Sequence, residues 1–102
     1  MKSNIELPGI DSHCVTVLDG KMYIYGGYIP SKAELMKDVY ALDLEKMQWE
    51  KIYTYKSTEK EPEGRSNCAM VGHSDFVYIF GGSNGVFTLN DFWRFSLKNK
   101  QW

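Results

Sequence analysis

Short runs in which hydrophobic and polar residues alternate follow one another along the chain, separated by turn residues. Residues 15–18 and 21–25 form two such runs joined by an Asp-Gly pair, a strong signal for a tight hairpin. Residues 38–44 form a third run, and residues 49–55 are a plausible outer strand. The pattern therefore predicts short antiparallel strands. No run keeps a 3.6-residue period, although residues 32–37 could form one helical turn.

The whole series occurs twice. In the second copy, residues 69–71 and 76–80 are joined by a turn at 72–75 and followed by a run at 91–97. Both copies contain, in the same order, a cysteine, a diglycine, an aspartate, an aromatic residue and a tryptophan. These residues are Cys14, Gly26, Gly27, Asp38, Tyr40 and Trp49 in the first copy and Cys68, Gly81, Gly82, Asp91, Trp93 and Trp102 in the second. The copies are 54 residues apart at the cysteines, 55 at the diglycines and 53 at the tryptophans, which indicates a structural repeat with small loop insertions.

A hydrophobic strand that ends in Gly-Gly, followed by an aromatic residue and a tryptophan at a period of about 50 residues, resembles the kelch repeat. The resemblance covers nearly the whole chain and implies an all-β fold of antiparallel four-stranded kelch β-propeller blades, about two blades of an incomplete propeller. Residues 12–55 would be the first repeat, 56–64 a polar connector, and 65–102 a second repeat with a truncated fourth strand. Residues 1–11 could include the outer strand of a preceding blade. We expect a fragment of a larger kelch-domain protein.

The repeated glycines and aromatic residues have a structural interpretation. Each diglycine closes the second strand of a pair, where glycine permits unusual backbone angles and close approach of a neighbour. We expect Tyr40, Trp49, Trp93 and Trp102 to pack between blades, because their spacing recurs. Two blades leave apolar faces open, so self-association through these faces is also expected.

Composition narrows the function classes. A net charge of −1 with scattered basic residues argues against nucleic-acid binding, and no apolar run approaches the length of a membrane span. The N-terminal residues carry no hydrophobic signal-peptide segment, and two cysteines do not make a disulfide scaffold. The expected setting is cytoplasmic, with a nuclear setting as the alternative.

The histidines and cysteines suggest no reactive centre. Zinc sites need three or four ligands in paired spacings, and neither His13 nor His73 has such a spacing. Cys14 and Cys68 occupy equivalent positions in the repeat, and equivalent points of adjacent blades usually lie further apart than the roughly 7 Å that a disulfide spans between Cα atoms. We therefore expect both cysteines to be small buried hydrophobic residues rather than a bonded pair.

Catalytic motifs are also lacking. There is no nucleophile elbow and no phosphate-binding loop, and Glu59, Glu61 and Glu63 lie in a polar, proline-containing connector where we expect them to stay solvated. Some kelch proteins are enzymes whose catalytic groups come from several blades. The sequence thus predicts no catalytic residue, no metal and no cofactor. An enzyme with its active site on other blades, or a purely structural repeat, are the alternatives.

Strand parity predicts where a partner would bind. In a four-stranded antiparallel meander, the first and third turns emerge at one end, while the second loop and the connector emerge at the other. The long segments 28–37, 83–90 and 54–65 all fall at this second end. Because binding residues concentrate on loops held by a rigid scaffold, this end should bind a protein or peptide partner. The chain would then be a non-catalytic interaction module, such as a substrate adaptor or scaffold.

Residues that follow each diglycine would lie at the mouth of this surface. They are Tyr28 in the first repeat, and Ser83 and Asn84 in the second. Kelch proteins of the BTB adaptor type hold peptides with polar and aromatic residues at these places and with Arg and Ser at the start of the first strand. By motif position that group is Arg65, Ser66 and Asn67 in this sequence.

Two observations weaken this assignment. The first repeat has Asp11-Ser12 where the second has Arg65-Ser66, which lowers the expected affinity for an acidic ligand. Plain turn chemistry also explains the Ser83-Asn84 pair. Arg65 could equally brace the contact between blades.

Overall fold

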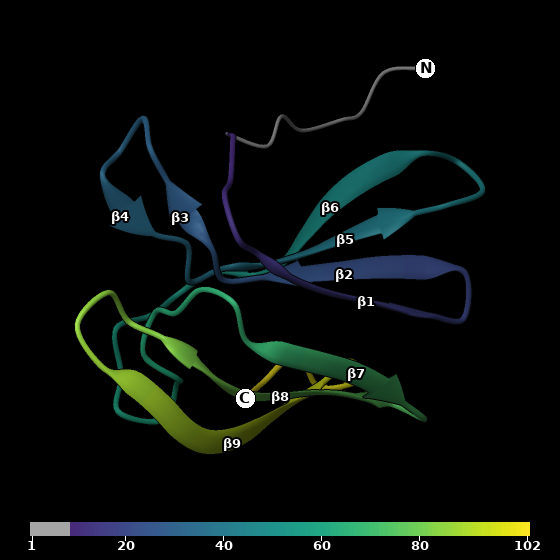
Figure 1. Ribbon diagram of the computed structural model, residues 1–102. Coiled ribbons are helices and arrows are strands. Elements are labelled where there is room, and N and C mark those ends of the chain that lie inside the picture. Colours follow the sequence, from purple (N-terminus) through teal and green to yellow (C-terminus); the bar gives the residue numbers. More distant parts are fainter. Residues whose placement is uncertain (1–8) are drawn as a thin grey trace.

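The computed structural model describes residues 9–102 as two antiparallel sheets packed face to face (Figure 1). Blade 1 is the sheet β1-β2-β5-β6, made of β1 (Cys14–Leu18), β2 (Lys21–Tyr25), β5 (Val39–Asp43) and β6 (Gln48–Tyr53). Blade 2 is the sheet β7-β8-β9, made of β7 (Ala69–His73), β8 (Phe76–Ser83) and β9 (Thr88–Ser96). A separate hairpin contains β3 (Tyr28–Ile29) and β4 (Glu34–Leu35). The all-β prediction is confirmed.

Some boundaries differ from the predicted ones. Residues 32–35 belong to the β3–β4 hairpin and residues 36–37 follow it, so the predicted helical turn at 32–37 is absent. In blade 2, β8 continues through its diglycine and pairs with an extended β9 as far as Ser83 opposite Thr88. The outer strand predicted within residues 1–11 lies almost wholly outside the described part of the chain. Within residues 9–102, no helix has the length and hydrophobicity needed to cross a bilayer.

Local chemistry sets the turns. Asp19 and Gly20 both have positive φ, 51° and 79°, as the tight β1–β2 hairpin requires. After β5, the Asp43 carboxylate accepts the Glu45 and Lys46 amides, both at 3.0 Å, and starts the turn into β6. In blade 2 the Ser96 hydroxyl accepts the Asn99 amide in the corresponding turn. The residues after this turn form one backbone bridge, between Ser96 and Gln101.

The core lies between the two sheets. Tyr25, Val39 and Tyr53 of blade 1 pack against Ile79 and Phe95 of blade 2. Trp93 and Trp102 close the edge of this cluster, and the Trp102 ring makes edge-to-face contacts with Tyr25 at 4.9 Å and Phe95 at 5.2 Å. Aromatic residues of both repeats thus hold the blades together.

Tyr40 and Trp49 occupy a different place from Trp93 and Trp102. They pack with Ile24 and Met36 on the face of blade 1 that points away from blade 2. In a propeller this face adjoins a preceding blade, just as the face of blade 2 that carries Trp93 and Trp102 adjoins blade 1. The repeated aromatic position therefore lies on the same face of both blades.

The backbone pairing aligns the first strands of the two repeats with an offset of 55 residues. Asp11 bridges Tyr28 in the same way that Ser66 bridges Ser83. Ser12 and Asn67, also 55 residues apart, both have positive φ, 59° and 57°. The backbone of the two repeats is therefore offset by 55 residues, whereas the two cysteines are offset by 54.

This difference of one residue brings the cysteines together. Cys14 lies opposite Tyr25, and its counterpart Ala69 lies opposite Phe80, so Cys68 is one position earlier in the repeat. Because successive residues of an extended chain point to opposite faces, Cys14 faces blade 2 while Cys68 faces blade 1. Their Cα atoms are 5.5 Å apart and their sulfurs form a disulfide. The prediction of two unbonded cysteines is wrong, because it assumed equivalent positions.

Candidate binding surface at the loop end

Three segments gather at one end of the molecule, at the left of Figure 1: the β3–β4 hairpin, the connector 54–65 and the β8–β9 turn at 84–87. We call this the loop end. The short turns β1–β2, β5–β6 and β7–β8 lie at the opposite end (Figure 1).

A buried glutamate shapes the connector. Glu61 is only 7% exposed, and its carboxylate accepts hydrogen bonds from the Tyr53 hydroxyl (2.6 Å), the Lys56 amide (2.7 Å), and the amide and hydroxyl of Thr58 (2.6 and 2.9 Å). Burial raises the pKa of Glu61, but these hydrogen bonds outweigh it and lower the pKa to about 2. The expectation that Glu61 stays solvated is wrong, because the connector folds around its carboxylate.

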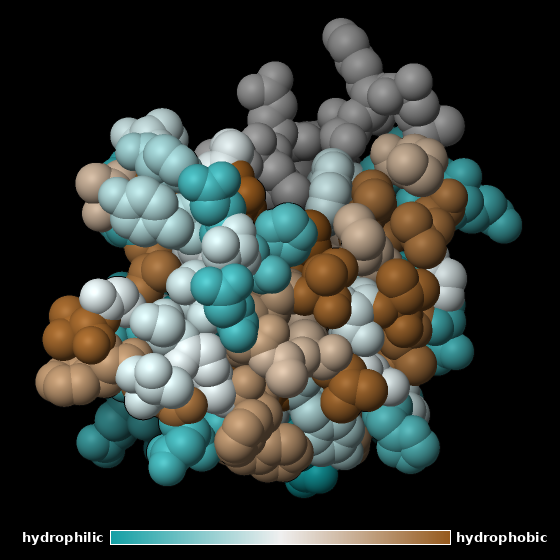
Figure 2. All heavy atoms as spheres, in the orientation of Figure 1, coloured by the Kyte–Doolittle hydropathy of each residue, from teal (hydrophilic) through white to brown (hydrophobic). Residues whose placement is uncertain are grey.

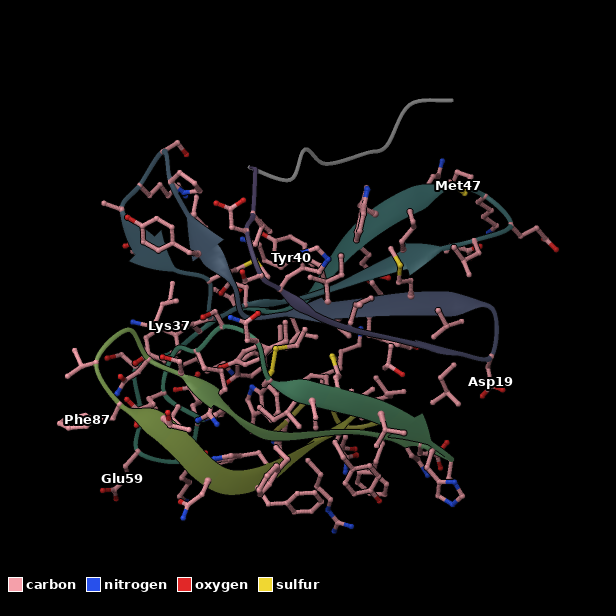
Figure 3. The ribbon with its side chains drawn as sticks, viewed as in Figure 1. Asp19, Lys37, Tyr40, Met47, Glu59 and Phe87 are labelled. Atoms are coloured by element: carbon pink, nitrogen blue, oxygen red, sulfur yellow. A yellow bond between two sulfur atoms is a disulfide. The ribbon has the colours of Figure 1, made fainter. Side chains whose placement is uncertain are left out.

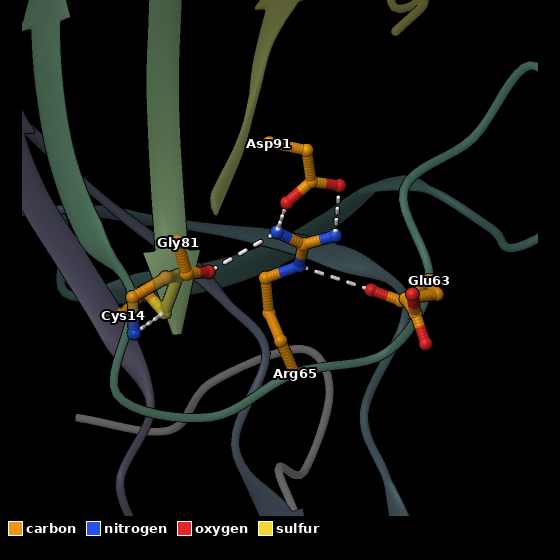
Figure 4. Close-up of a disulfide and its surroundings, with 6 residues drawn as sticks. Cys14, Glu63, Arg65, Gly81 and Asp91 are labelled. Atoms are coloured by element: carbon orange, nitrogen blue, oxygen red, sulfur yellow. Dashed lines mark hydrogen bonds and ion pairs between the residues drawn. A yellow bond between two sulfur atoms is a disulfide. The ribbon is translucent and has the colours of Figure 1, made fainter. Parts of the chain in front are cut away.

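Arg65 begins blade 2 and is fully buried. Its guanidinium holds the Asp91 carboxylate through two nitrogen–oxygen contacts of 2.5 and 2.8 Å, and it also donates to the carbonyls of Gly81 and Glu63, both at 3.1 Å (Figure 4). The Trp93 indole donates to the same carboxylate at 2.8 Å. Hydrogen bonding from Arg65 lowers the pKa of Asp91 to about 2, against the opposing effect of burial.

The predicted binding role of Arg65 conflicts with this geometry. Its side chain offers no surface to a ligand, and its carbonyl accepts the Gly27 amide at 2.8 Å. A Cβ on Gly26 would lie 2.6 Å from the same carbonyl oxygen, so glycine is needed there for close approach. Arg65 thus braces the contact between the blades, as the alternative to ligand binding predicted.

Blade 1 lacks this centre. The offset of 55 residues puts Ile10 where Arg65 stands, and Asp38, the counterpart of Asp91, has no arginine. Asp38 instead accepts the Tyr55 amide at 2.7 Å and faces the Lys51 ammonium at 3.5 Å.

Ser66, Asn67 and Ser83 contribute mainly their backbone. Ser66 and Ser83 exchange two main-chain hydrogen bonds of 2.8 and 2.9 Å, and the Asn67 amide donates to the Ser12 carbonyl at 2.9 Å. The Asn67 side chain is exposed. Tyr28, at the start of β3, is 40% exposed and pairs with Asp11 through two bonds of 2.8 Å.

Asn84 organises the β8–β9 turn. Its side-chain oxygen accepts the amides of Val86 and Phe87 at 2.9 and 2.8 Å, and its side-chain nitrogen donates to the Glu63 carboxylate at 2.9 Å. The turn therefore displays two large hydrophobic side chains, Val86 at 80% and Phe87 at 67% exposure. Figure 2 shows hydrophobic residues at this tip, and in Figure 3 Phe87 points away from the molecule.

Sequence reasoning missed the pair Val86-Phe87, which we call the apolar tip. A signal was available, since a Val-Phe pair within a turn-forming segment has no sheet face to cover. Its exposure depends on how Asn84 closes the turn, which strand parity does not reveal.

A cleft of about 750 Å³ lies beside the β3–β4 hairpin. Its polar wall includes Lys32, Lys37 and Lys51, and its inner wall includes Met36 and Tyr40. The Lys51 ammonium is already paired with Asp38 at 3.5 Å. Among residues 9–102, no group of three or more His, Cys, Asp and Glu side chains is placed to hold a metal ion.

Residues 3–102 match the family model described as the KLHDC2/KLHL20/DRC7 Kelch-repeats domain. The chain belongs to the kelch-repeat family. Its two sheets are therefore propeller blades, and each blade contains a diglycine, Gly26-Gly27 in the first and Gly81-Gly82 in the second.

Similar proteins have diverse names. Host cell factor of Drosophila melanogaster is 30% identical over 84 residues, which cover 72% of this chain and 6% of that protein. Acyl-CoA-binding domain-containing protein 5 of Arabidopsis thaliana is 32% identical over 89 residues, covering 86% of this chain and 13% of that protein. N-acetylneuraminate epimerase 1 of Escherichia coli O6:H1 is 33% identical over 66 residues, covering 62% and 15%. The chain thus spans a small part of each relative.

Proposed function

We propose that this kelch unit is a non-catalytic protein-interaction module that binds a protein or peptide partner through its loop end, as an adaptor or scaffold in the cytoplasm or nucleus. The apolar tip carries the proposal. Leaving a large apolar side chain in water forgoes about 1.5–3 kcal/mol that burial would provide. Val86 and Phe87 are nevertheless held outward by the Asn84 side chain.

The bracing of the tip favours binding. Ordering a flexible loop costs free energy on association, and a turn already fixed by hydrogen bonds avoids most of that cost. Aromatic side chains are also frequent among the residues that dominate binding energy. Phe87 provides such a side chain in the β8–β9 turn, and Tyr28 provides a second exposed aromatic on the β3–β4 hairpin.

The test compares the apolar tip with another exposed hydrophobic pair at the opposite end. Peptides would be selected from a display library against the chain, and their affinities measured by fluorescence polarisation for the wild type, for V86S/F87S and for L44S/M47S. Leu44 and Met47 are exposed hydrophobic residues of the β5–β6 turn, so they control for general stickiness.

We expect V86S/F87S to weaken binding at least tenfold, because each of the two side chains loses buried area worth on the order of 1 kcal/mol or more. L44S/M47S should bind like the wild type. Equal affinities for the wild type and V86S/F87S would reject the loop end as the binding surface. Thermal unfolding of each variant checks that the fold is intact.

Self-association through the open blade faces is a further part of the proposal. Blade 2 exposes Val71, Phe80 and Phe92 on the face that points away from blade 1, and apolar patches of this kind favour association. Sedimentation velocity across a range of concentrations would detect it. A monomer at all concentrations would contradict it.

A second copy would not simply repeat the contact between blades 1 and 2. At the positions where blade 1 presents Val39 and Ala41 to blade 2, the outer face of blade 2 presents the larger Phe92 and Arg94. These larger side chains would overpack a copy of the existing interface.

An enzyme with further blades is the second candidate, favoured by the 33% identity to a protein named as an epimerase. It predicts stoichiometric binding of a metal or small molecule by the full-length protein. Native mass spectrometry of that protein would separate the two candidates.

A further inference from the structure

The disulfide joins Cys14, the first residue of β1, to Cys68, the residue immediately before β7. These are the only two cysteines of the chain, 54 residues apart. We propose that they form a reversible thiol–disulfide site, a redox-controlled clamp that fastens blade 1 to blade 2. This inference does not depend on the proposed function.

The position of the pair is suited to a clamp. Beside the disulfide, the two blades are joined by three bonds: the Asn67 amide to the Ser12 carbonyl (2.9 Å), the Gly27 amide to the Arg65 carbonyl (2.8 Å), and the Cys68 amide to the Cys14 sulfur (3.1 Å). Figure 4 shows the sulfur pair next to the Arg65 centre. The covalent link therefore fixes the segment that begins blade 2.

The diglycines make room for both cysteines. A Cβ on Gly26 would lie 3.4 Å from the Cys14 sulfur, and a Cβ on Gly82 would lie 3.1 Å from the Cys68 Cβ. The Cα atoms are 5.5 Å apart, close to the usual separation of bonded cysteines. The blades as they are packed in the structure therefore accommodate the disulfide at an ordinary Cα separation.

The two cysteine residues differ in exposure. Cys14 is 2% exposed, whereas Cys68 is only partly buried. An incoming thiolate such as glutathione would attack the Cys68 sulfur and displace the Cys14 thiolate, and a second glutathione would then release Cys68. In the reverse direction, two protein thiols lose two protons and two electrons, and one glutathione disulfide becomes two glutathiones.

The reduced protein should remain folded. Tyr25, Ile79 and Phe95 belong to the buried core between the blades, which does not depend on the sulfur bond. In a reducing compartment the pair would be a dithiol, and cytosolic disulfides usually act as transient redox devices. Oxidation would then tighten the start of blade 2 and the loop end next to it.

The experiment titrates the purified chain with glutathione buffers of increasing oxidised fraction. Thiols are trapped by alkylation, and the intact mass counts them. We expect the two thiols to disappear together within the monomer. The oxidised form should melt about 10 °C or more above the reduced form, and the Asn67 amide should exchange with solvent at least tenfold more slowly.

Two outcomes would overturn the clamp. One is that native thiols resist oxidation and react only after unfolding in urea. The other is that oxidation leaves both the melting temperature and the Asn67 exchange rate unchanged. The C14A/C68A variant is the control, because neither quantity should respond to glutathione in it. The wild-type titration decides the matter even if that variant folds poorly.

Discussion

Replacing Asp91 with asparagine removes a charge from the junction of the blades while keeping the size of the side chain. Asp91 accepts two contacts from the fully buried Arg65 guanidinium and one from the Trp93 indole. In D91N the guanidinium keeps only neutral acceptors. Leaving a buried charge without its partner costs about 3–5 kcal/mol. Since 40% of the Asp91 side chain is exposed, water can partly replace the carboxylate. We therefore expect D91N to lose about 2–3 kcal/mol of stability.

The chain contains a matched control in the other repeat. Asp38 holds the same repeat position but accepts one amide and faces the exposed Lys51 instead of a buried arginine. D38N should cost about 1 kcal/mol or less, because surface ion pairs and single hydrogen bonds contribute little. Urea unfolding at pH 7, followed by circular dichroism, measures both values. Equal losses for D91N and D38N would refute the assignment of a buried ion pair.

Acid titration gives an independent check on Asp91. Its pKa is lowered to about 2 in the folded protein, against about 3.9 for an ordinary aspartate. A lowered pKa stabilises the fold above the unfolded value, and this contribution disappears as the pH falls through the folded value. The difference in stability between the wild type and D91N should thus be constant above about pH 5 and shrink towards pH 2. A difference that stays constant down to pH 2 would contradict the charge argument. Comparing with D91N cancels the similar titration of Glu61.

Two further pairs of variants isolate single contacts, each measured by urea unfolding. G26A and G20A place a Cβ at nearly the same φ, 78° and 79°, but only the Cβ at position 26 meets a carbonyl oxygen, at 2.6 Å. G26A should therefore lose about 2 kcal/mol more stability than G20A. Equal losses would show that the close contact is easily relieved. Among residues 9–102 the buried Tyr25 hydroxyl has no hydrogen-bond partner, whereas the Tyr53 hydroxyl donates to Glu61 at 2.6 Å. Y25F should therefore be neutral or stabilising and Y53F should lose about 1–2 kcal/mol, and a larger loss for Y25F would mean that its hydroxyl has a partner in solution.

Much of the fold could be predicted from the sequence, because the repeat and the alternation of residues within it directly express the strands. Which face of its sheet each residue occupies could not be predicted. Treating the two cysteines as equivalent positions is an error of one residue, and in an extended chain such an error exchanges the two faces. Only the observed pairing of Cys14 with Tyr25 and of Ala69 with Phe80 shows that the sulfurs face each other.

The candidate site could be predicted in outline only. Motif position locates Arg65 correctly at the start of the second repeat. The burial of its side chain depends on Asp91, which is 26 residues away. In the sequence Glu61 is one of several acidic residues in the connector, and nothing local shows that Tyr53 and Thr58 turn towards it. The roles of Arg65 and Glu61 thus depend on side-chain contacts that form only when the connector folds.

The double contact of Arg65 has a consequence for what counts as a unit in this protein. Its side chain secures the start of blade 2, while its carbonyl accepts an amide from the diglycine of blade 1. A cut between the two sequence repeats would thus leave the Gly27 amide of the first without its acceptor. Blade 1 is therefore complete only together with Arg65, the first residue of blade 2.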